Sequence, residues 1–173
     1  MIIGLSGRKC SGKAEIANVL VKNFKFKRLY MALPLKKIIS ELVGFDVNEK
    51  QETKTAIVDK VLDENDIKLV SQRTGIDENF IRTETQGVTF HTVRDMLQII
   101  GTDVIRKYNP LWHINEVMKL IDDKSSYVID DIRFPNEKKA IEERGGDVWF
   151  IVRPVINDIS NHVSETSLQW QDF

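Results

Sequence analysis

The chain carries the sequence Gly7-Arg8-Lys9-Cys10-Ser11-Gly12-Lys13 directly after a short apolar run, Met1-Ile2-Ile3-Gly4-Leu5. This stretch fits G-x-x-x-x-G-K, the pattern of a phosphate-binding loop between a buried strand and the helix that follows it. The glycines let backbone N–H groups point inward, the helix N-terminus adds positive potential, and Lys13 reaches the outer phosphates. The pattern predicts a phosphate-binding loop; the alternative is a glycine-rich turn that binds no ligand.

The residues after the lysine depart from the usual pattern. A Ser or Thr hydroxyl normally contacts Mg²⁺ at the first of these positions, but this chain has Ala14 and then Glu15. Apolar residues recur at helical spacing over residues 16–21, as expected for the helix behind such a loop. The sequence therefore predicts the strand, the loop and the helix, but it has no hydroxyl for Mg²⁺ at position 14.

Composition limits the functional classes. The chain has 173 residues, with 25 Lys and Arg against 26 Asp and Glu, so its balanced charge argues against a general nucleic-acid binder. A single cysteine, Cys10, fits a reducing compartment. No signal-peptide pattern and no apolar stretch of about 18 residues is found in the sequence. We therefore expect a cytoplasmic protein that binds neither nucleic acid nor membrane.

Strands and helices alternate along most of the chain. The expected strands are apolar throughout, which predicts an α/β fold with a parallel sheet and helices on both faces. Residues 45–90 are predicted to form a partly helical insertion, with helical spacing over residues 56–70. The other expected strands cover residues 26–32, 127–131 and 147–152, and the other expected helices cover residues 34–43, 92–108, 111–121 and 134–144.

Ligands of parallel sheets bind at the carboxyl ends of the strands. Those ends hold the glycine-rich loop, the turn with Asp130, Asp131 and Arg133, and Arg153. We predict that Asp131 contacts Mg²⁺, with Asp130 as the alternative because successive strand side chains point in opposite directions. A helix-capping acid is the other interpretation of Asp131. Arg133 can clamp a phosphate or form a structural ion pair.

A second group of candidates lies on the helix expected over residues 92–108. Arg94 and Gln98 share one side of this helix, with Gly101 and Thr102 one turn further on. The group suits a second phosphate and the edge of a nucleobase, although a solvated helix face explains the same spacing.

Two more residues are candidates for the same role. Lys36 lies in the first turn of the helix that begins at Pro34, where a cation opposes the helix dipole, so either a nearby anion or simple solvation explains it. Trp112 can stack on a base, but a position in the core is the preferred interpretation.

Taken together, these motifs resemble the bacteriophage-type deoxynucleoside monophosphate kinases, which have the P-loop nucleoside monophosphate kinase fold. The resemblance spans nearly the whole chain outside residues 45–90, and its middle blocks are the most specific. The motifs are Gly7-x4-Gly12-Lys13, Leu33-Pro34-Leu35-Lys36, Arg94-x3-Gln98-x2-Gly101-Thr102-Asp103, Trp112, Asp131-Ile132-Arg133-Phe134-Pro135-Asn136-Glu137, Gly145-Gly146, Arg153-Pro154 and His162-x-Ser164-Glu165.

The resemblance implies a three-layer P-loop kinase domain over residues 1–173, with a mostly helical insertion at about 45–90 and a lid-like segment at about 153–168. It implies transfer of the γ-phosphate of ATP, with Mg²⁺, to a deoxynucleoside 5′-monophosphate. The implied catalytic residues are Lys13, Asp131 and Arg133, with Asp131 as the metal ligand; the ATP-binding residues are Gly7, Lys9, Cys10, Ser11, Gly12, Lys13, Ala14, Glu15 and Arg153; and the acceptor-binding residues are Lys36, Arg94, Gln98, Gly101, Thr102, Trp112 and Arg133.

Two departures from this family leave an alternative open. Similar proteins usually continue Gly-Lys with Asp-Thr where this chain has Ala14 and Glu15. They also continue through another strand and helix beyond the position of Phe173. This chain is then either a short form, or its edge strand is missing or supplied by a partner, as in a homodimer. The alternative function is a nucleotide-binding protein with weak or no catalytic activity.

Overall fold

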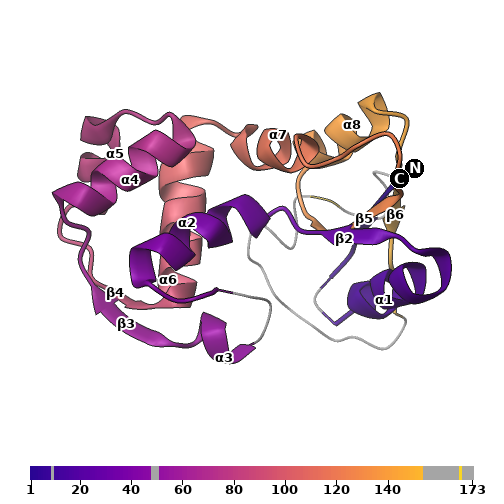
Figure 1. The fold of residues 1–173 in the computed structure, drawn as a ribbon, viewed down its shortest axis with the longest axis horizontal. Helices are drawn as coiled ribbons and strands as arrows, with labels where there is room; N and C mark the ends of the chain where they lie inside the picture. Colours follow the sequence, from indigo (N-terminus) through magenta and orange to yellow (C-terminus); the bar gives the residue numbers. More distant parts are fainter. Residues whose placement is uncertain (9, 48–50, 154–167, 169–173) are drawn as a thin grey trace. The chain divides into compact units, whose positions relative to one another are not determined.

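The computed structural model describes residues 1–8, 10–47, 51–153 and 168, and the chain divides into two compact units (Figure 1). The first unit combines Met1–Met31 with Ile114–Phe173, and the second is Ala32–His113. The phosphate-loop pattern belongs to the first unit. The predicted insertion at about 45–90 lies within the second, and of the predicted lid only Arg153 and Leu168 are among the described residues.

The first unit is built on a four-stranded sheet in the order β2-β5-β1-β6, with every neighbouring pair parallel. The α/β class and the parallel sheet are therefore confirmed, although β2 and β6 are shorter than predicted. The elements of this unit are β1 (Ile2–Ser6), α1 (Lys13–Phe24), β2 (Lys27–Leu29), α7 (Trp112–Met118, of which the first two residues belong to the second unit), β5 (Tyr127–Ile132), α8 (Pro135–Glu143) and β6 (Asp147–Phe150).

Helices cover both faces of this sheet, because side chains of β1 alternate between two apolar clusters. Ile3 and Leu5 pack in a cluster with Ala17 of α1. Ile2, on the opposite face, packs in a cluster with Ile141 of α8 and with residues of α7. Figure 1 shows α1 on one side of the sheet and α7 and α8 on the other. The three layers predicted from the alternation of strands and helices are thus present.

The second unit has its own apolar core and a two-stranded antiparallel sheet, β3-β4. Its core is formed by buried side chains from α2, α4, α5, α6 and η1. The elements are α2 (Leu33–Val43), α3 (Gln51–Lys54), β3 (Ile57–Lys60), α4 (Glu64–Thr74), α5 (Glu78–Thr85), β4 (Phe90–Thr92), α6 (Val93–Gln98) and η1 (Ile99–Arg106), which is a π-helix.

The helix inferred from the apolar spacing over residues 56–70 is absent from the first half of that range. Residues 57–60 form β3, and α4 begins only at Glu64. Asp63 and Asp66 set this boundary with a capping box: Asp63 Oδ1 accepts from the Asp66 backbone N at 2.9 Å, and Asp66 Oδ2 accepts from the Asp63 backbone N at 3.0 Å. The two carboxylates accept hydrogen bonds from backbone N–H groups at the start of α4, which have no acceptor within the helix. These contacts favour a helix that begins at Glu64.

The helix predicted over residues 92–108 is present, but it changes from α to π geometry at Ile99. Within the π segment, Gly101 lies so close to α2 that a Cβ there would be 2.7 Å from Cδ2 of Leu35. The carbonyl oxygen of Gly101 accepts a hydrogen bond from Nε2 of His113 at 3.1 Å. A side chain at position 101 would therefore displace the side chain of Leu35.

Candidate active site

The glycine-rich loop connects β1 to α1 with a backbone that favours glycine at two positions. Gly7 has φ 138°, and a Cβ there would lie 2.4 Å from the carbonyl oxygen of Ile151. Gly12 caps α1 with φ 97°, in the left-handed region. Both glycines of the pattern are therefore required by the local geometry.

Lys13 is the first residue of α1, and its ammonium group lies against the loop. Nζ donates to the carbonyl oxygens of Gly7 at 2.6 Å and Arg8 at 2.7 Å, and to Oγ of Ser11 at 3.4 Å. These acceptors are neutral, so an anionic phosphate oxygen in the loop is a stronger acceptor for the same ammonium. The ammonium group of Lys13 thus faces the glycine-rich loop, and its binding of phosphate stays a prediction.

A pocket of about 420 Å³ lies at this loop and brings together groups from remote parts of the sequence. It collects cations from α1, from the turn after β5 and from the chain after β6, as expected for the carboxyl ends of parallel strands. Lys9, also predicted to bind ATP, lies outside the described residues. The pocket is lined by Cys10, Ser11, Gly12, Lys13, Ala14, Glu15, Asp130, Arg133 and Arg153.

The structure distinguishes the two carboxylates at the end of β5. Asp130 lines the pocket, whereas Asp131 is not among the lining residues and accepts from the backbone N of Met31 at 2.7 Å. The register of β5 is irregular at this point: Gly4 pairs with Ile129 and Ser6 with Ile132, so one extra residue of β5 is inserted between these pairs. Such a bulge changes the direction in which strand side chains point.

Arg28 is a residue of this site that the sequence analysis missed. Its Nη2 donates to Oδ2 of Asp130 in an ion pair, and its Nη1 donates to Oδ1 of Asn18 at 2.9 Å. Burial lowers the pKa of Arg28, but the hydrogen bond and charge of Asp130 outweigh this effect, so the pKa is raised. A charged residue inside a short strand of a parallel sheet was the only sequence signal for this role.

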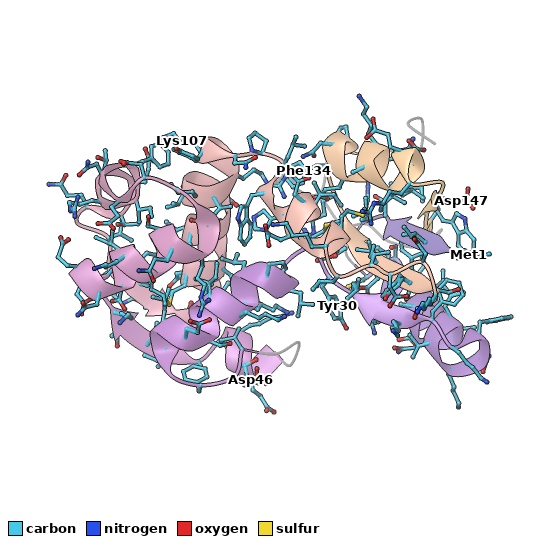
Figure 2. All side chains as sticks on the ribbon, turned by 45° about the horizontal axis from the view of Figure 1, so that its top comes forward. Met1, Tyr30, Asp46, Lys107, Phe134 and Asp147 are labelled. Carbon is cyan, nitrogen blue, oxygen red and sulfur yellow. The ribbon has the colours of Figure 1, made fainter. Side chains whose placement is uncertain are left out.

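The guanidinium of Arg28 also lies over the ring of Tyr30, with Cζ 5.1 Å from the ring centroid. Tyr30 follows β2 and is labelled in Figure 2. Its pKa is raised, chiefly by burial, with a smaller opposing effect from Arg28.

The turn that carries Arg133 is held by a buried carboxylate. Oε2 of Glu137 accepts from the backbone N of Arg133 at 2.9 Å and of Phe134 at 3.2 Å, which caps α8. Pro135 then occupies the first turn, where its missing N–H has no cost. The motif from Arg133 to Glu137 thus fixes the backbone from which the Arg133 side chain enters the pocket.

Removal of the Asp131 carboxylate from water raises its pKa to about 6, against the opposing effect of the Met31 N–H. Between about pH 4 and 6 the folded chain therefore binds more protons than the unfolded chain, so this group stabilises least above pH 6. We predict that Asp131→Asn, relative to the natural chain, gains stability as pH rises from 4.5 to 7.5. Urea unfolding without divalent cations measures the free energy of unfolding of both chains. An equal difference in this free energy between the variant and the natural chain at pH 4.5 and pH 7.5 would contradict the raised pKa of Asp131.

The predicted acceptor residues other than Arg133 lie in the second unit. The exposed side chains of Arg94 and Gln98 on α6 and Thr102 on η1 follow one another along a continuous helical segment. Lys36 is buried on α2, and Trp112 is only 5% exposed and packs in the core of the unit, with its ring edge-on to His113. The preferred interpretation of Trp112 as a core residue agrees with this packing.

Residues that could hold a metal are few. Within the described part of the chain, no three His, Cys, Asp or Glu side chains form a metal-binding group. Mg²⁺ commonly uses one or two carboxylates together with substrate phosphates. Asp130 fits that pattern, because its Oδ1 is buried and has no hydrogen-bond partner among the described residues, and Glu15 lines the same pocket.

No helix among the described residues has both the length and the apolar character needed to cross a membrane.

Comparison with known proteins identifies the family of the chain. The family model for deoxynucleotide monophosphate kinase matches residues 45–173. A protein of Acanthamoeba polyphaga mimivirus named "Putative deoxynucleotide monophosphate kinase" is 30% identical over 185 residues, which cover 98% of this chain and 82% of the relative. The chain has a parallel sheet flanked by helices and a glycine-rich loop after its first strand; it belongs to the deoxynucleotide monophosphate kinase family and has the P-loop kinase fold.

Proposed function

We propose that this protein transfers the γ-phosphate of ATP to a deoxynucleoside 5′-monophosphate and releases ADP and the deoxynucleoside diphosphate. The observation that carries the proposal is the pocket in which Lys13, Asp130, Arg133 and Arg153 meet the glycine-rich loop, in a chain of this kinase family. Phosphoryl transfer depends mainly on positioning and on neutralising charge, and these are the groups that can do both.

On the donor side, the loop N–H groups and Lys13 bind the β- and γ-phosphates of ATP. Arg133 and Arg153 supply two further cations that balance the charge of the transferred group. Mg²⁺, when bound, would neutralise part of the charge of the phosphates. Oδ1 of Asp130, which is buried without a hydrogen-bond partner among the described residues, would hold the metal ion, and Glu15 is a second acid in the same pocket.

On the acceptor side, the proposal follows the family resemblance. Arg94, Gln98 and Thr102 supply a cation, an amide and a hydroxyl from the α6–η1 segment, which suit a phosphate and a base edge. Gly101, Lys36 and Trp112 are buried around that segment, so we propose that they shape the acceptor site rather than provide exposed contacts.

Steady-state turnover tests the proposal. ADP release should be measured with Mg-ATP and each of the four common deoxynucleoside monophosphates in turn. In parallel, the rate at which a maleimide labels Cys10 reports ATP binding, because Cys10 is the single cysteine of the chain, is exposed and lines the pocket. Protection of Cys10 by ATP without turnover on any acceptor would favour the alternative, a nucleotide-binding protein with little or no activity.

The residue after Lys13 offers a second test. Ala14 is exposed and lines the pocket, so a larger side chain has room there. We predict that Ala14→Thr raises kcat several-fold by restoring the hydroxyl that normally contacts Mg²⁺. Ala14→Val adds similar bulk without the hydroxyl and should give no gain. If Ala14→Thr is no faster than the natural enzyme, the site already uses another ligand, such as Glu15.

A further inference from the structure

We propose that Arg28 is a positioning residue for the phosphate site: it holds one oxygen of Asp130 so that the other is available to a metal ion bound to the nucleotide. The inference rests on the proposed function, because it assumes that the pocket binds a metal–nucleotide complex. Arg28 does not line the pocket itself, so its effect is exerted through Asp130.

The two oxygens of Asp130 have different surroundings. Oδ2 accepts from Nη2 of Arg28 in an ion pair whose side chains are 22% exposed for Arg28 and 8% exposed for Asp130. Oδ1 is buried and has no hydrogen-bond partner within the described residues. An unsatisfied carboxylate oxygen at a buried position is costly unless a ligand uses it. The contact with Arg28 thus fixes the carboxylate and leaves one acceptor for a ligand.

Arg28 is itself held by two further contacts. Nη1 donates to Asn18 on α1, the helix that begins at Lys13, and the guanidinium stacks over Tyr30. One planar group therefore connects β2, α1 and β5, and it links the helix of the phosphate loop to the strand that carries Asp130. A lysine has no planar fork and cannot make these contacts at once.

Charge explains why Asp130 needs such a partner. Three cations line the pocket with it: Lys13, Arg133 and Arg153. Without Arg28, the carboxylate of Asp130 would gain most by pairing with one of them, which would remove both a metal ligand and a phosphate-binding cation. We therefore expect loss of Arg28 to weaken the metal-dependent part of nucleotide binding.

Equilibrium binding separates this role from a general loss of affinity. ATP affinity should be measured by calorimetry in EDTA and in Mg²⁺, and Mn²⁺ affinity of the ATP complex by electron paramagnetic resonance, with no acceptor present. The variants are Arg28→Met, Arg28→Lys and the matched control Arg73→Met, which removes an exposed arginine paired with Glu41 in the second unit. Urea unfolding of each variant confirms that it is folded.

The natural chain should bind ATP more tightly with Mg²⁺ than without it. Arg28→Met should lose about tenfold of that enhancement while its affinity in EDTA stays near that of the natural chain, as for the loss of one charge-assisted contact. Arg28→Lys, which keeps the charge, should lose less, and Arg73→Met none. In an Asp130→Asn background, Arg28→Met should have no further effect on the enhancement, because the two residues act together.

The outcomes distinguish two failures. If the natural chain binds no ATP, the proposed function fails. If the natural chain shows the Mg²⁺ enhancement and folded Arg28→Met or Arg28→Lys keeps it in full, Arg28 does not position Asp130. Equal weakening in EDTA and in Mg²⁺ would also overturn the inference, because it would place the effect of Arg28 on the loop or the nucleotide.

Discussion

Replacement of Lys13 by alanine should lower kcat/KM by about 10²-fold or more and remove most of the protection of Cys10 by ATP. The expected size is that of removing one preorganised charged donor from a phosphate or oxyanion site. Lys13 also donates to the carbonyl oxygens of Gly7 and Arg8, so the variant loses a contact that closes the loop as well as one that binds phosphate. Both effects act in the same direction, on binding of the donor nucleotide.

Lys22→Ala is the matched control for this variant. Lys22 is exposed in the last turn of the same helix, so its removal changes the net charge equally without touching the loop. It should leave kcat/KM and Cys10 labelling close to those of the natural chain. A Lys13→Ala enzyme with full activity would refute the assignment of the loop as the donor site.

The features predicted well from the sequence are those with a local physical cause. The loop from Gly7 to Lys13 has its own backbone requirements, and strands buried on both faces are apolar throughout. Because parallel strands end at one edge of a sheet, their order along the chain was enough to predict that Lys13, Arg133 and Arg153 meet.

The choice between Asp130 and Asp131 could not be made from the sequence. Alternation along a strand says only that the two side chains point in opposite directions. Which of them faces the loop depends on which face of the sheet α1 covers: Val128 packs in the same cluster as Ala17 of α1, and Asp130 lies two residues further along β5. The sequence-based choice of Asp131 as the metal ligand therefore stays a prediction, beside the structure-based choice of Asp130.

Long-range contacts and competing local signals explain the other differences. Arg28 pairs with a residue 102 positions away, which no local pattern reveals. The helix predicted from residue 56 was based on apolar spacing, but pairing of β3 with β4 and the capping box at Asp63 decided the boundary instead. The acid at position 66, three residues after Asp63, was the available signal for the true start.

Asp130→Asn should lower kcat by about 10²-fold or more and abolish the strengthening of ATP binding by Mg²⁺. The amide keeps an oxygen that can accept from Arg28, so the fold should survive, but it removes the charge that a metal ion needs. The measurements are steady-state turnover and ATP binding with and without Mg²⁺, together with unfolding curves that separate loss of function from loss of structure.

Asp131→Asn is the matched control, because it makes the same chemical change one residue further along β5. Its amide oxygen can still accept from the backbone N of Met31, and the side chain does not line the pocket, so the Mg²⁺ enhancement should persist. Comparison of the two variants therefore shows which of the two carboxylates supports metal-dependent binding of ATP. If Asp131→Asn shows the larger loss of metal-dependent binding, then the metal ligand is Asp131, and the bulge in β5 must place that carboxylate toward the nucleotide when the substrate is bound.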